Sequence, residues 1–61
     1  MAFPADDGIF LSLVSMKLRD EYFSLRALCE DYDTDEKEVL ARLASLHYRY
    51  DEGTNRIVRA E

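Results

Sequence analysis

From residue 7 to residue 46 the apolar positions recur with the three- to four-residue spacing of α-helices, and beyond residue 47 they alternate. The alternating runs Tyr48–Tyr50 and Arg56–Val58 flank a turn-rich segment, as the strands of a hairpin do. The pattern predicts helices over about 7–19, 24–32 and 35–46 and a β-hairpin over about 48–58. We therefore expect a single α+β domain spanning residues 1–61, with three helices and a C-terminal β-hairpin.

Short polar residues stand where each predicted helix begins, as N-caps do. The candidates are Asp6 or Asp7, Ser24, and Thr34 or Asp35. Behind these caps the second and third helices carry apolar residues on one face. We expect a core formed by Leu28, Cys29, Val39, Leu43 and Leu46.

The first helix has more apolar residues than one core should need. They cover roughly 220° of its circumference, about twice the arc of an ordinary surface helix. This excess predicts self-association, because a domain this small gains stability by dimerising. Lys17 lies inside the apolar sector, and we expect its ammonium to extend past the helix end rather than enter a buried charge pair. The predicted interface comprises Phe10, Leu11, Val14 and Leu18 of this helix and Leu40, Ala41 and Ala44 of the third.

The segment from Leu28 to Leu46 resembles a winged helix-turn-helix. Cys29 stands where that pattern has a small residue between crossing helices, and Asp33 replaces the glycine of the turn. Asp enters the left-handed backbone region more readily than most residues, so Asp33 can take a positive φ. The resemblance implies a winged helix-turn-helix-like arrangement with the hairpin as the wing.

A longer resemblance covers nearly the whole chain. It rests on Leu11-Ser12, Met16-Lys17-Leu18-Arg19-Asp20, Ser24-Leu25, Leu28-Cys29, Asp33 and the hairpin from Tyr48 to Asn55. These motifs are similar to those of a family of short uncharacterised bacterial proteins, which has no established activity. Ser15 replaces the usual Asn of that family. His47 replaces a turn-former, which argues against a left-handed C-cap at this position.

Charge argues against nucleic acid as the partner. The chain has thirteen acidic and eight basic side chains, a formal net charge of −5, and none of the segments 1–23, 24–34, 35–47 and 48–61 has a net positive charge. Binding to phosphates normally requires a cationic surface. In a helix-turn-helix the outward face of the third helix would carry Asp35, Glu36, Lys37, Leu40, Ala41 and Ala44, with one cation among them. Only Arg49, Arg56 and Arg59, in and after the hairpin, could contact nucleic acid.

No motif in the chain predicts catalysis or a metal site. The run Asp31–Asp35 imitates a calcium-binding loop, but Glu36 and Arg42 fall where that loop needs its glycine and closing glutamate. Cys29, the only cysteine, can form no disulfide within the chain, and with His47 it falls short of a zinc site. We expect a buried, protonated Cys29 thiol and His47 at the end of the third helix. We expect no enzyme, no cofactor and no metal.

Together these patterns favour a non-enzymatic oligomerising or protein-interaction module in the bacterial cytoplasm, acting as a homodimer or with another protein. A lone cysteine suits a reducing compartment, and the longest apolar run, Ile9–Leu11, is far too short to span a membrane. The alternative function is a weak or auxiliary DNA-binding transcriptional regulator that uses the wing. An enzyme is a distant third.

Overall fold

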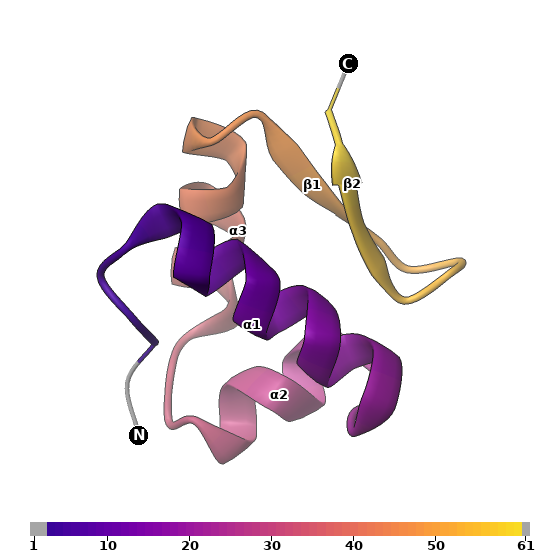
Figure 1. Ribbon diagram of the computed structural model, residues 1–61. Coiled ribbons are helices and arrows are strands. Elements are labelled where there is room, and N and C mark those ends of the chain that lie inside the picture. The colour runs from indigo at the N-terminus through magenta and orange to yellow at the C-terminus, as the bar shows by residue number, and fades with distance from the viewer. Residues whose placement is uncertain (1–2, 61) are drawn as a thin grey trace.

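Helix α1 crosses the front of the molecule, with the other elements packed behind and below it (Figure 1). The computed structural model describes residues 3–60. Its elements are α1 (Asp7–Asp20), α2 (Leu25–Asp31), α3 (Glu36–Ser45), β1 (Tyr48–Asp51) and β2 (Arg56–Arg59). The predicted α+β fold, with three helices followed by a two-stranded antiparallel hairpin, is confirmed.

The helices begin where side-chain oxygens can accept free backbone N–H groups. Of each pair of candidates for the first and third helices, Asp6 and Asp35 are the caps. The capping bonds run from the N–H groups of Ile9 to Asp6 (3.0 Å), Ala27 to Ser24 (3.1 Å) and Lys37 to Asp35 (2.9 Å).

Both connections that flank α3 depend on left-handed backbone. Asp33, between α2 and α3, has φ 54°, as the comparison with a turn glycine predicts. His47, after α3, has φ 68°, so the expectation that it would not form a left-handed C-cap is wrong. Histidine enters this region more often than bulkier residues. The His47 N–H donates to the Ala44 carbonyl (3.0 Å) and its own carbonyl accepts from Ala60 (3.0 Å), which links the helix end to the hairpin.

The core lies between the three helices and one face of the hairpin. The buried side chains are Phe10, Val14, Leu18, Leu25, Leu28, Cys29, Tyr32, Val39 and Leu43. Four of the five predicted core residues are among them. Leu46, at the C-cap of α3, is half-buried and packs against this cluster.

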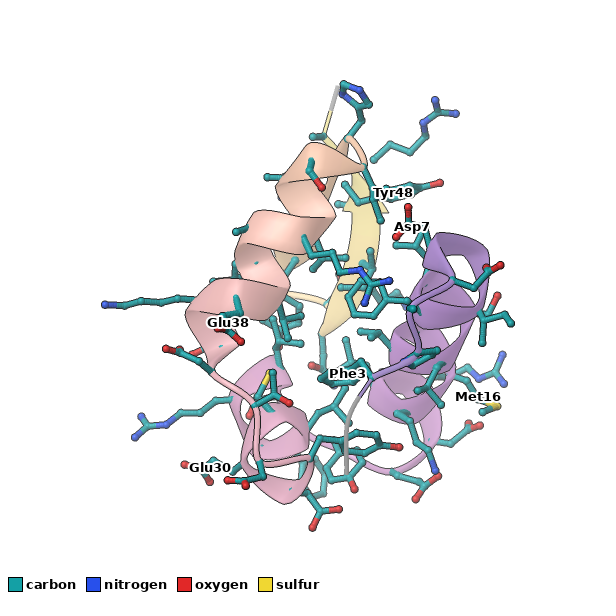
Figure 2. The ribbon with its side chains drawn as sticks, turned by 90° about the vertical axis from the view of Figure 1, so that its left-hand side faces the viewer. Phe3, Asp7, Met16, Glu30, Glu38 and Tyr48 are labelled. Atoms are coloured by element: carbon teal, nitrogen blue, oxygen red, sulfur yellow. The ribbon has the colours of Figure 1, made fainter. Side chains whose placement is uncertain are left out.

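The wide apolar arc of α1 is covered within one chain. Phe10, Val14 and Leu18, three of the predicted interface residues, are 1%, 0% and 3% exposed, so these side chains are buried within the chain. The helix packs on α2 and also on β2, so two parts of its circumference are covered at once. Phe3 covers a third part, since it packs edge-on against Phe10 (5.6 Å between centroids) and stacks on Tyr32 (4.7 Å) between α1 and the neighbouring helices (Figure 2).

The Lys17 ammonium lies at the end of α1, 2.5 Å from the Glu21 carboxylate. Its side chain is 23% exposed, which fits the expectation that the stem is covered while the charge reaches the helix end. The hydrogen bond to Glu21 raises the pKa of Lys17.

Candidate interaction surface

The remaining predicted interface residues lie on two separate elements. Leu11 of α1 is half-buried and packs against the core. On α3, Leu40 is 39% exposed, and Ala41 and Ala44 are exposed beside it. Leu40, Ala41 and Ala44 therefore form a small apolar strip on α3, and Leu11 lies on a different element.

The three hairpin arginines do not share one face. In an antiparallel pair, residues directly opposite each other point to the same side and neighbours along a strand alternate. Arg49 opposes Val58 and Asp51 opposes Arg56, whereas Arg59 opposes Tyr48. Arg49 and Arg56 therefore share a face with the Asp51 carboxylate, and Arg59 lies on the opposite face.

Among residues 3–60, the most exposed large apolar side chain is Phe23, which lies between the first two helices that the sequence predicts. It is 98% exposed, compared with 59% for Ile9 and 44% for Met16. Met16 projects from the side of α1 away from α3 (Figure 2). Phe23 belongs to no helical repeat, so the periodicity of the sequence gives no signal for it. Its position between a helix end and the Ser24 N-cap is the signal that could have identified it.

The backbone on both sides of Phe23 is held by hydrogen bonds. The Tyr22 N–H donates to the Lys17 carbonyl (3.0 Å), and the Tyr22 carbonyl accepts from the Asn55 amide. The Tyr22 hydroxyl donates to the Asp31 carboxylate, across to α2. That hydrogen bond, with burial as the second cause, raises the pKa of Tyr22 to about 12. Ser24, on the other side, caps α2. The exposed ring therefore projects from a segment held at both neighbours.

Asn55 ties the turn of the hairpin to the end of α1. Its Nδ2 donates to the carbonyls of Leu18 (3.0 Å) and Tyr22 (2.8 Å), and its Oδ1 accepts from the Tyr50 hydroxyl (2.6 Å). The Tyr50 hydroxyl oxygen in turn accepts the Leu25 N–H (3.3 Å). These bonds use a carbonyl in the last turn of α1, which has no partner within the helix, and they fix the hairpin turn beside Phe23.

A hollow of about 320 Å³ lies between the end of α1 and the hairpin turn, and we call it the Phe23 hollow. It is lined by Leu18, Arg19, Asp20, Glu21, Tyr22, Phe23, Thr54, Asn55 and Arg56. A second hollow of about 410 Å³, also bordered by Phe23, reaches Tyr50 and the start of α2. Phe23 is thus a ridge between two depressions.

The charges around the Phe23 hollow balance. Its lining includes two arginines, Arg19 and Arg56, and two carboxylates, Asp20 and Glu21. Arg19 pairs with Asp20 (Nε to Oδ1 3.1 Å), and this hydrogen bond lowers the pKa of the Asp20 carboxyl. The border therefore has no net charge, in a protein whose total is −5.

The reactive side chains of the protein lie away from this surface. Cys29 is 2% exposed, and its burial raises the thiol pKa to about 11. Over residues 3–60, histidine, cysteine and carboxylate side chains nowhere gather in threes as a metal site requires. Within the same residues no helix has the length and hydrophobicity to cross a membrane. The surface around Phe23 therefore offers a partner an exposed aromatic ring and a hollow with balanced charge.

The fold and this surface define a small α+β domain that presents one exposed aromatic ridge. The chain belongs to the family described as Domain of unknown function (DUF4250), whose model matches residues 4–57. This membership confirms the resemblance to a family without an established activity. The chain matches no curated protein and no solved structure.

Proposed function

We propose that this protein is a small, non-enzymatic interaction module that uses Phe23 as its anchor on another protein surface. The observation that carries the proposal is the 98% exposure of Phe23 on a backbone fixed by Tyr22 and Ser24. Aromatic side chains dominate binding energy at protein interfaces. Because the backbone that carries the ring is already held by hydrogen bonds before binding, ordering this segment costs little further conformational entropy.

The surroundings of Phe23 support the same proposal. The ring lies beside a hollow with charged side chains of both signs at its border, which resembles the apolar centre and polar rim of protein interfaces. The lone buried thiol suits a reducing cytoplasm. We therefore propose a reducing cytoplasm as the setting, and the resemblance to short bacterial proteins is the reason to propose a bacterial one.

A second candidate function is weak DNA binding through the hairpin of a winged helix-turn-helix-like fold. The observation in its favour is that Arg49 and Arg56 are exposed on one face of the hairpin. Asp51 shares that face, and its carboxylate accepts hydrogen bonds from Gly53 (3.0 Å) and Thr54 (3.1 Å) in the turn. A carboxylate between two arginines weakens their attraction for phosphate, so we rank this function second.

Photo-cross-linking tests the interaction module. A benzophenone amino acid replaces Phe23 in one variant and Lys37, exposed on α3, in a matched control. We expect discrete cross-linked products from position 23 that fall when excess unlabelled wild-type protein competes, and that persist when excess Phe23→Ser protein is used instead. Products equal to those of the Lys37 control, or competed equally by both proteins, would overturn the proposal.

A further inference from the structure

We infer that the surface bound by Phe23 is the Phe23 hollow of a second copy of this chain, with the two rings exchanged across a two-fold axis. This inference rests on the proposed function and specifies its partner. It also replaces the contacts of buried α1 residues that the sequence predicted for a dimer.

The arrangement of ridge and hollow suits a two-fold dimer. In such a dimer the same patch is used by both copies, so the patch must be complementary to itself. Phe23 borders the hollow that it would fill in its partner, so one rotation places both rings at once. The hollow measures about 320 Å³, and a cavity of about 150 Å³ is enough to admit benzene. The volume is therefore sufficient for a phenylalanine ring.

Charge favours this face over the outer face of α3. Two copies of a chain with a net charge of −5 repel each other. The N-terminal end of α3 carries Asp35, Glu36 and Glu38, so a dimer through α3 would bring like charges together. The border of the Phe23 hollow is neutral. Arg56 forms no ion pair within residues 3–60 and can pair with a carboxylate of the second copy.

The area involved implies a weak dimer. Two aromatic side chains bury roughly 300 to 500 Å² in total. A stable interface needs at least about 1,200 Å², so the borders of both hollows must supply the remainder. Because that remainder is polar, we expect dissociation constants above about 1 μM, in the range of transient complexes.

Sedimentation equilibrium combined with ¹⁵N NMR tests the inference. The protein is measured from about 10 μM to about 1 mM, which brackets a weak association. We expect a monomer–dimer equilibrium in the wild type, with concentration-dependent shifts in the amide signals of Thr54 and Asn55. Those residues lie in the hollow, far in sequence from Phe23, so their shifts report the inserted ring.

Two variants separate this interface from any other. Phe23→Ser should weaken the dimer about 30-fold or more, as loss of an anchor residue does, and should unfold at the wild-type temperature because the ring is exposed. Leu40→Ser, on α3, is the matched control and should leave the equilibrium unchanged. A wild type that stays monomeric up to the highest concentration, or a dimer lost with Leu40→Ser instead, would overturn the inference.

Failure of the inference differs from failure of the proposed function. If the wild type is monomeric and the cross-link at position 23 that wild-type protein competes away contains a different protein, the self-association is overturned and the interaction module stands. A monomeric wild type without a competed cross-link overturns both.

Discussion

Asn55 is the residue whose replacement tests the structural basis of this surface most directly. One side chain joins three segments, because it bonds to Leu18 at the end of α1, to Tyr22 in the connection and to Tyr50 of β1. Asn55→Gly removes these bonds and leaves the positive φ of 55° without strain. Asn55→Ala removes the same bonds and adds a methyl group in the left-handed region.

The expected losses follow from these contacts. Each of the three hydrogen bonds contributes about 0.5 to 1.5 kcal/mol net, so Asn55→Gly should lower the free energy of unfolding by about 1.5 to 4.5 kcal/mol. Asn55→Ala should cost about 1 kcal/mol more because of its backbone conformation. A domain of this size has only about 3 to 5 kcal/mol in total. Both variants should therefore be marginally folded.

Urea titration followed by far-ultraviolet circular dichroism measures these losses. Thr54→Ala is the control, since Thr54 lies in the same turn and its hydroxyl bonds only to Asp51 in the described part of the chain. We expect its effect to stay within about 0.5 kcal/mol. If Asn55→Gly also falls within that margin, the amide does not hold the hairpin against α1 and the reasoning is refuted.

Three further predictions concern the core and the DNA alternative. Leu43→Ala should lower the free energy of unfolding by about 2 to 5 kcal/mol because the side chain is fully buried. A smaller loss, measured by urea titration, would contradict the place of Leu43 in the core. Cys29 should resist thiol reagents until denaturant is added. Burial raises the pKa of Cys29 from 9.0 to about 11, so the thiol ionises at lower pH in the unfolded chain than in the folded one. The free energy of unfolding should therefore fall between these pH values by up to about 1.4 kcal/mol per pH unit. Cys29→Ala should reduce this slope, and an unchanged slope would show that Cys29 does not cause it. Fluorescence titration should show negligible binding of the wild type to duplex DNA at physiological salt. The double variant Asp35→Asn, Glu36→Gln should gain weak, sequence-independent binding to duplex DNA. Micromolar wild-type binding lost with Arg56→Ala would favour the DNA-binding function instead.

Local signals in the sequence predicted the helix starts and the α2–α3 packing correctly. Capping and turn formation depend on residues a few positions apart, which is why Ser24 and Asp33 could be assigned from the sequence. The spacing of Val39 and Leu43 likewise identifies one helix face without knowledge of its partner. Element type and the central core are therefore accessible from pattern alone.

The burial of the first helix within one chain was not predicted, because an apolar arc does not reveal what covers it. Arg42 lies over the Phe10 ring, with its Cζ 3.9 Å from the centroid. It also donates to the Ala5 carbonyl (2.9 Å) and the Asp7 carboxylate (3.0 Å). The residues in these two hydrogen bonds are at least 35 positions apart, so no local pattern contains them. Phe10 is buried because Arg42 and Phe3 cover its ring, and neither contact can be inferred from the spacing of apolar residues in the first helix.

Stability and binding are coupled in this small domain through the hairpin turn. The Asn55 bonds that hold the turn against α1 also position one wall of the Phe23 hollow. A partner that fills the hollow binds only the folded chain, so it stabilises the fold by mass action. Phe23 itself contributes almost nothing to the core, since it is 98% exposed. Replacing Asn55 should therefore reduce both stability and binding, whereas replacing Phe23 should reduce binding and leave the stability of the isolated chain unchanged. That asymmetry distinguishes a surface maintained for binding from an apolar side chain that the fold merely leaves outside.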